Sequence, residues 1–178
     1  MEKYVNMADI ISAQEMGEAE TVALIELLFF AYRDFVSDPD AILEEFGFGR
    51  AHHRVVHFVG RDPGMTVQQL LDILRITKQS LGRVLKELID KGYVYQKEGE
   101  ADRRQRLLFL TGEGEALRQR LMGPQKARIR RALENSGAEA AHFYRLALYH
   151  MVDPDNQASV RDWLDRVSII GETGQDRG

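Results

Sequence analysis

The chain has 178 residues, of which 44% are hydrophobic and 29% are charged, and it contains no cysteine. This length and composition predict a globular protein of one domain with an elaborated end. The lack of cysteine excludes a disulfide framework, a thiolate zinc finger and a redox-sensing thiol. No apolar run approaches the roughly 18 residues of a membrane span, and the first residues show no secretory signal pattern, so we expect a cytoplasmic protein without a membrane partner.

The formal charge of −4 is unevenly distributed along the chain. The segment from Arg75 to Arg106 holds nine basic and five acidic residues, whereas the remainder carries a balance of −8. This asymmetry indicates a basic contact surface on an acidic body. An unevenly charged but merely solvated surface is the alternative.

The first predicted helix covers Glu20–Val36, where apolar residues recur at helical spacing. The segment is apolar over most of its circumference, which is typical of a helix buried on several sides. In a protein of this size that pattern indicates a subunit interface. We expect the helix to end at Ser37-Asp38-Pro39-Asp40, because proline disfavours helix in the residue before it.

Three further helices are predicted around a short turn. One covers about residues 49–60. Thr66, with Gln69 three residues later, forms a capping box that begins a short helix. After a three-residue connector, Thr77 caps the next helix, which ends at Gly92, where a left-handed residue fits.

A β-hairpin is predicted to follow directly. Tyr93–Tyr95 and Leu107–Leu110 are rich in strand-forming residues and flank eleven polar residues. The rest is helical, with helices expected from Thr111 to about Asn135, over about Ala138–Val152 and over about Asn156–Ser168. The sequence therefore predicts a mainly α protein with a small β-wing, which is a winged helix-turn-helix domain with an added helical region.

The second helix of a helix-turn-helix enters the major groove with its N-terminal end, which must therefore carry hydrogen-bonding side chains. Gln pairs bidentately with adenine and Arg with guanine, and arginine in a narrow minor groove reads shape. On the wing, Asp102 is expected to orient a neighbouring arginine by a charge-assisted hydrogen bond. A solvated charged turn is the alternative. The candidate DNA-binding residues are Thr77, Lys78, Gln79, Ser80, Arg83 and Lys86 on the helix, with Arg103, Arg104 and Arg106 on the wing.

The segment ITKQSLGRVLKELIDKGYVYQKEGEADRRQRLLFLT, residues 76–111, resembles the MarR-type (multiple antibiotic resistance regulator) family of bacterial transcription factors. The D-x-R wing motif matches at Asp102 and Arg104. The end of the recognition helix matches at Gly92-Tyr93-Val94, and the end of the wing matches at Leu110-Thr111-Gly112. The resemblance covers roughly Val22–Asn135.

This resemblance implies a homodimer that binds a pseudo-palindromic operator on double-stranded DNA, most often as a repressor. Lys78, Gln79, Ser80 and Arg83 would face the major groove and Arg104 the minor groove. A small aromatic or anionic effector releases DNA in many family members. The implied organisation is a dimerisation helix and linker (1–48), the winged helix-turn-helix domain (49–111), C-terminal helices completing the dimerisation region (112–170) and a flexible tail (171–178).

Residues on the helix over 49–60 leave two ligand hypotheses open. His53 and His57 are four residues apart on one helix face, a spacing at which two histidines can bind the same metal ion. No third ligand is evident, so we expect no metal and no cofactor. Arg50 and Arg54 beside them make an anion-binding effector surface the stronger hypothesis. No nucleophile motif or phosphate-binding loop is present in the sequence, so we do not expect an enzyme. A winged helix that binds protein instead of DNA is the remaining alternative.

Overall fold

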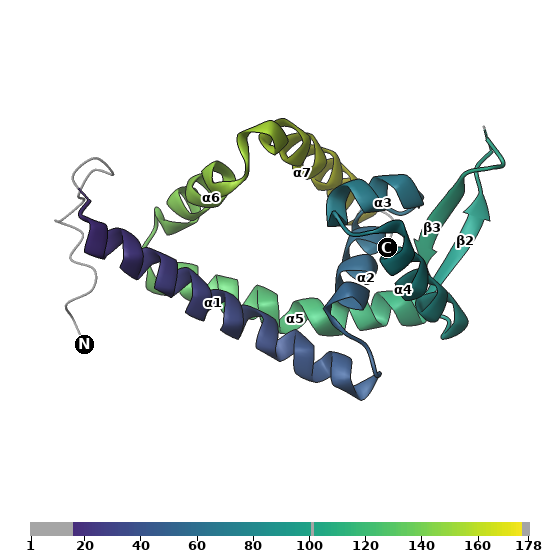
Figure 1. The fold of residues 1–178 in the computed structure, drawn as a ribbon, viewed down its shortest axis with the longest axis horizontal. Coiled ribbons are helices and arrows are strands. Elements are labelled where there is room, and N and C mark those ends of the chain that lie inside the picture. Colours follow the sequence, from purple (N-terminus) through teal and green to yellow (C-terminus); the bar gives the residue numbers. More distant parts are fainter. Residues whose placement is uncertain (1–15, 101, 176–178) are drawn as a thin grey trace. The chain divides into compact units, whose positions relative to one another are not determined.

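A computed structural model describes residues 16–100 and 102–175 of the chain. It is mainly helical and contains a small antiparallel sheet (Figure 1). In chain order the elements are α1 (Glu18–Glu45), α2 (Arg50–Arg61), β1 (Met65–Thr66), α3 (Val67–Leu74), α4 (Lys78–Asp90), β2 (Val94–Glu98), β3 (Arg106–Leu110), α5 (Gly112–Asn135), α6 (Ala140–Met151) and α7 (Pro154–Gln175).

The first helix is longer than predicted. The expected stop at residues 37–40 is wrong, because α1 continues through Pro39 to Glu45. Proline removes one hydrogen bond of the helical ladder, but Pro39 and Leu43 are both buried. Burial of these two apolar side chains offsets the lost bond. The chain nevertheless divides into two compact units at this point, one ending at Ser37 and the other beginning at Asp38.

The helix-turn-helix has the caps that the sequence predicts. The Thr66 hydroxyl accepts from the N–H of Gln69, whose side chain in turn accepts from the Thr66 N–H, so the capping box at the start of α3 is confirmed. The Thr77 hydroxyl accepts from the Ser80 N–H at the start of α4. At the other end of α4, Gly92 has a φ of 77°, which confirms a left-handed stop.

The hairpin belongs to a sheet of three strands in the order β1-β3-β2. Strands β2 and β3 pair antiparallel with Gln96 opposite Leu108, so the predicted hairpin is confirmed. Sequence reasoning missed β1, which pairs with β3 through Met65 opposite Leu108. This third strand attaches the base of the wing to the start of α3.

The core of the second unit is formed by one apolar face of each element of the winged domain. Helix α4 contributes Leu81, Val84, Leu85 and Leu88, and α5 contributes Leu117 and Leu121. Gly114 lies where α5 begins, and a Cβ there would lie 2.0 Å from the Tyr93 carbonyl oxygen. The fully buried large side chains are Leu43, Met65, Leu70, Leu81, Leu88, Leu108 and Leu121.

The last of the C-terminal helices extends further than predicted. Helix α5 ends at Asn135 as expected. The last helix begins at Pro154, a residue favoured in the first helical turn, and runs to Gln175. The predicted end at Ser168 is therefore wrong, and residues 171–175 of the expected flexible tail are helical. Residues 176–178 of that tail lie outside the described part of the chain.

Candidate nucleic-acid interface

Helix α4 separates a buried face from a cationic face. Its apolar side chains point into the core, with Leu81 and Leu88 fully buried. All six candidate positions of the helix, from its cap to its third turn, are exposed. Because the core holds one face of α4, the opposite face is available to a partner. The candidates on this helix are Thr77, Lys78, Gln79, Ser80, Arg83 and Lys86.

The first turn of α4 arranges its hydroxyl groups. The Thr77 hydroxyl donates to the Ser80 oxygen at 2.9 Å and accepts from the Ser80 N–H at 3.1 Å. The Thr77 hydroxyl thus both donates and accepts a hydrogen bond within the cap. The proton of the Ser80 hydroxyl is still available for donation. Ser80 is therefore better placed than Thr77 to contact a phosphate or a base edge.

Among the residues that the structure describes, two of the nine candidates have acidic partners. Lys86 forms an ion pair with Asp90 one turn later on α4. Arg106 donates from Nη1 to the Glu98 carboxylate at 2.7 Å, directly across the strand pair. Exposed pairs of this kind contribute about 0–1 kcal/mol each. Phosphate groups can therefore replace the carboxylates at small cost.

The tip of the wing is built around Asp102. Its Oδ1 accepts a hydrogen bond from a neighbouring arginine, but from the backbone N–H of Arg104, at 2.9 Å, and not from a guanidinium. Asp102 thus shapes the turn. The Asp102 carbonyl also accepts from the Gln105 N–H at 3.0 Å. Within the described residues, neither the Arg103 nor the Arg104 guanidinium forms an ion pair, and both residues are exposed.

The wing also carries a cation that sequence reasoning missed. Lys97 of β2 places its ammonium 5.6 Å from the ring centre of Tyr95 and 5.2 Å from that of Phe109. The two rings stack on each other with centres 5.4 Å apart. Lys97 and Tyr95 are two residues apart on a strand, so their common face could have been inferred from strand periodicity.

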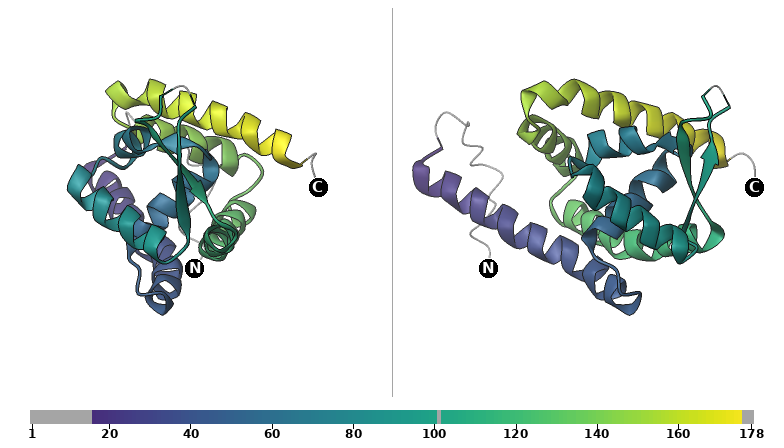
Figure 2. Two further views of the ribbon diagram at one scale, coloured as in Figure 1. Left: turned by 90° about the vertical axis from the view of Figure 1, so that its right-hand side faces the viewer. Right: turned by 45° about the vertical axis from the view of Figure 1, so that its right-hand side comes forward.

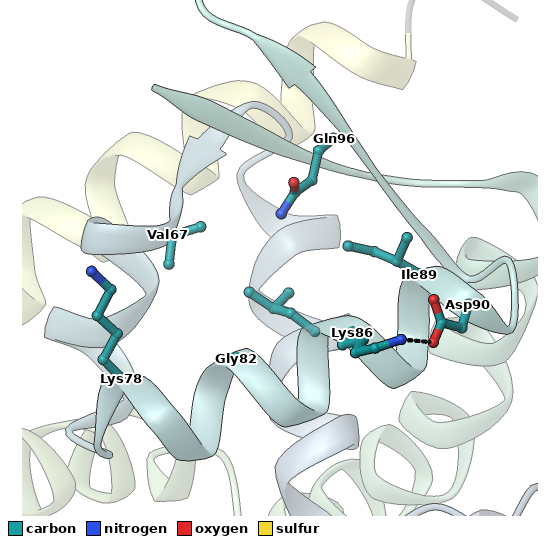
Figure 3. A pocket seen from close by; sticks show the side chains of 8 residues that line it. Val67, Lys78, Gly82, Lys86, Ile89, Asp90 and Gln96 are labelled. Atoms are coloured by element: carbon teal, nitrogen blue, oxygen red, sulfur yellow. Dashed lines mark hydrogen bonds and ion pairs between the residues drawn. The ribbon is translucent and has the colours of Figure 1, made fainter. Parts of the chain in front are cut away.

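A shallow groove lies between α4, the start of α3 and β2 (Figure 3). Its volume is about 380 Å³, and Lys78 and Lys86 lie along its α4 side. Gln96 points from β2 toward α4, and Val67 and Ile89 supply apolar surface. Asp90, the ion-pair partner of Lys86, also lines the groove, which joins the recognition helix to the wing.

The position of α4 relative to α2 is fixed by His52. Its Nδ1 accepts from the Gly49 N–H at 3.1 Å, so Nε2 is the protonated nitrogen and donates to Glu87 at 3.0 Å. Hydrogen bonds from Lys91 and His52 hold the pKa of Glu87 below its ordinary value. The His52 ring also stacks on Phe48 at 4.6 Å. Sequence reasoning did not predict these contacts.

The predicted effector residues Arg50, His53, Arg54 and His57 all lie on α2, at positions i, i+3, i+4 and i+7 of one helix face. Arg50 donates twice to the Asp40 carboxylate, with a shortest distance of 2.7 Å, so this arginine already holds an anion. Arg54 is exposed, and burial lowers the pKa of His53. Within the described residues, no cluster of three or more His, Asp or Glu side chains could hold a metal ion.

His57 is the most unusual of these four residues. Its Nδ1 is buried and has no hydrogen-bond partner among the described residues. Burial, followed by the proximity of His53 and then of Arg118, Arg61 and Lys126, lowers the pKa of His57 to about 4. The imidazole is therefore neutral at pH 7 within a group of cations.

These features define a winged helix-turn-helix protein whose recognition helix and wing present a cationic, hydrogen-bonding surface. The order α2-β1-α3-α4-β2-β3, the capped turn between α3 and α4, and the arginine-bearing hairpin are its defining elements. None of the described helices is both long and apolar enough to cross a membrane.

Comparison with known proteins gives the family. The sequence model of the MarR family matches residues 46–105. The HTH-type transcriptional regulator PetP of Rhodobacter capsulatus is 48% identical over 130 residues, which are 73% of this chain and 78% of that protein. The chain belongs to the MarR family and is a transcriptional regulator that binds DNA.

Solved structures share the fold. FabT of Streptococcus pneumoniae, crystallised in complex with DNA, matches with a TM-score of 0.65 at 18% identity, over 83% of this chain and 99% of that one. A MarR family protein of Mycobacterium tuberculosis in complex with p-aminosalicylic acid matches with a TM-score of 0.52 at 22% identity, over 73% of this chain and 98% of that one.

Proposed function

We propose that the protein is a repressor that binds a pseudo-palindromic operator as a homodimer, with α4 in the major groove and the wing in the minor groove. The observation that supports this assignment most strongly is the division of α4. Its core face is fully packed, whereas Lys78, Gln79 and Arg83 are exposed on its other faces. A winged helix that binds only protein would not need cations at both α4 and the wing tip.

Base recognition is assigned to Gln79 and Arg83, and shape recognition to Arg104. Arg83→Ala removes a side chain able to bind guanine bidentately, so it should weaken operator binding by about 1–3 kcal/mol and relax the base preference at one position. Arg104→Ala should weaken binding to all sequences that share a narrow minor groove. The measurement is fluorescence anisotropy on a duplex that the wild-type protein selects from a random library, and on single-base variants of it.

Glu113→Gln is a suitable control for these substitutions, because Glu113 is exposed in the first turn of α5 and belongs neither to α4 nor to the wing. If Arg83→Ala, Gln79→Ala and Arg104→Ala all bind the selected duplex as tightly as the wild type, the assignment of these residues fails. If Arg83→Ala weakens binding equally for every base variant of the duplex, Arg83 contacts a phosphate and not a base edge.

The homodimer is supported by apolar surface that a monomer would leave in water. In α1, Leu27, Phe29 and Phe30 are 60%, 70% and 55% exposed. Helix α6 by itself exposes Phe143 and Met151 at 55% and 62%. Extended apolar surfaces of this kind mark interaction sites. Two-fold symmetry would then place two recognition helices about 34 Å apart, which is one turn of DNA.

We also propose an anionic aromatic effector near His57. The support is a buried Nδ1 that has no hydrogen-bond partner in the described part of the chain and lies close to Arg61, Arg118 and Lys126. A MarR family protein of the same fold binds p-aminosalicylic acid, which makes that compound a suitable probe. Titrating it into the protein–duplex complex should lower the anisotropy, and His57→Phe should abolish this response. An unchanged anisotropy up to millimolar ligand would contradict the effector proposal and leave DNA binding unaffected.

A further inference from the structure

Helix α7 lies outside the segment matched by the family model and has one face in contact with the helix-turn-helix. Asn156, Val160, Trp163 and Val167 recur at helical spacing and are buried or half-buried, whereas most residues between them are exposed. Val167 is 2% exposed, and Trp163 packs against the core of the winged domain. Figures 1 and 2 show α7 passing close to α3.

The first contact is at the turn of the helix-turn-helix. Arg75 ends α3 and, with a φ of 50°, is the one non-glycine residue in the described part of the chain with a left-handed backbone. Its Nη2 donates to the side-chain oxygen of Asn156, near the start of α7. A strained residue in the turn is thus held by a helix 81 positions later in the chain.

The second contact is at the opposite end of α3. Asp62 lies in the turn that leads into β1 and α3, and its side chain is only 15% exposed. Arg166 of α7 donates from Nη2 to this carboxylate at 2.9 Å. Arg61 completes the contact by donating from Nη2 to the Val167 carbonyl at 3.3 Å.

An aromatic contact lies between these two ends. The Trp163 ring meets Phe58 of α2 edge to face, with centres 5.5 Å apart. The guanidinium of Arg166 lies over the Trp163 ring at 5.0 Å. The guanidinium of Arg166 therefore lies between the Trp163 ring and the largely buried Asp62 carboxylate.

The spacing along α7 fits the length of α3. Asn156 and Arg166 are ten residues apart, which is about 15 Å of helix, and the eight residues of α3 span about 12 Å. We propose that α7 is an intramolecular brace that holds α3 at both ends, with Asn156, Trp163 and Arg166 as positioning residues for DNA binding. The inner face of α7 thus packs against the helix-turn-helix of the same chain.

The brace has a direct consequence for affinity. Helix α3 and its two flanking turns set where α4 begins, so loosening either end lowers the fraction of molecules with α4 correctly placed. The apparent dissociation constant rises in proportion as that fraction falls. Loss of the brace therefore weakens binding without removing any contact to DNA.

The test uses the full chain and three variants. Arg166→Asp places a second carboxylate beside that of Asp62, so the two repel each other. The double variant Asp62→Arg with Arg166→Asp exchanges the two charges and restores the attraction. Asn156→Ala removes only the contact to Arg75. Arg161→Ala is the matched control, because Arg161 lies on the same helix but donates to the Tyr149 hydroxyl of α6 at 2.7 Å.

Amide hydrogen exchange of residues 67–74 is measured first, and it needs no DNA. Arg166→Asp and Asn156→Ala should raise exchange there about fivefold or more, while Arg161→Ala and the charge-swapped variant stay near the wild type. Affinity for the selected duplex should fall about fivefold or more in the same two variants and recover in the charge-swapped one. If the contacts of α7 only stabilised the fold, their loss would lower Tm and leave the dissociation constant of the folded protein unchanged.

Two results would overturn the brace. One is unchanged exchange in α3 for folded Arg166→Asp and Asn156→Ala. The other is an equal rise in exchange for Arg161→Ala, which would mean that any disturbance of the C-terminal helices loosens α3.

Discussion

At the scale of single residues, local and long-range contacts differ in how well they can be predicted. The caps at Thr66 and Thr77 act over three residues, and both were predicted. The bond from His52 to Glu87 spans 35 positions, and no pattern in the sequence indicated it. Asp102 was correctly placed at the wing tip, but the sequence could not distinguish a contact to a guanidinium from one to the backbone N–H of Arg104.

Gly114 offers a residue-scale prediction about packing. A Cβ at this position would lie 2.0 Å from the Tyr93 carbonyl oxygen, which is backbone and cannot move aside easily. Gly114→Ala should therefore lower the free energy of unfolding by about 1–3 kcal/mol, measured by urea denaturation at fixed protein concentration. A Cβ at Gly82 of α4 would meet nothing within 4 Å beyond its own helix, so Gly82→Ala should raise the free energy of unfolding by roughly 0.5–1 kcal/mol. Equal effects of the two substitutions would disprove this account of Gly114.

His57 predicts a pH dependence of stability. Its pKa is lowered to about 4 in the folded protein, mainly by burial, and it is about 6.5 in an unfolded chain. Between these values the unfolded state binds more protons, so stability falls as the pH drops from 6.5 toward 4, by up to about 3 kcal/mol. Urea denaturation at pH 7 and pH 5 should show a smaller loss in His57→Leu. Replacing the exposed His150 by Gln is the control; if His57→Leu and His150→Gln lose the same stability as the wild type, His57 is not the group responsible.

At the scale of elements, the errors in the sequence prediction have tertiary causes. The predicted stop at Pro39 failed because burial of Pro39 and Leu43 outweighs the lost hydrogen bond. Strand β1 has only two residues and exists because β3 pairs with it, so no local pattern could indicate it. The early end assigned to α7 followed from glycine and charge near the C-terminus, whereas the helix continues to Gln175.

The apolar surface of α1 gives an element-scale prediction. Phe29 is 70% exposed, more than any other large apolar side chain described. If α1 forms the dimer interface, Phe29→Glu places a charge in it and should weaken the dimer at least about tenfold, because an unpaired buried charge is costly. Phe29→Leu keeps the site apolar and should change it little. Sedimentation velocity over a concentration series distinguishes the two, and a monomeric wild type at micromolar concentration would contradict the proposed dimer.

At the scale of the whole molecule, the opposing charges of its parts have a functional meaning. The chain carries −4 overall, but the segment with the recognition helix and wing is positive. An acidic body limits non-specific attraction to DNA, and the local positive surface determines which face approaches it. The fold class and this surface could both be predicted, because both depend on contiguous sequence. The contacts between α7 and the helix-turn-helix could not, because they join segments that are far apart in the chain.

The central claim is that the α4 and wing surface binds DNA specifically, and the most direct measurement of it is the salt dependence of that binding. A duplex selected by the protein and a scrambled duplex of equal length are compared by anisotropy between 50 and 200 mM salt. If each protomer neutralises three or four phosphates, the logarithm of the association constant should fall with a slope of roughly −5 to −7, with the selected duplex favoured at every salt concentration. A slope near zero, or equal affinity for the two duplexes throughout, would contradict the account.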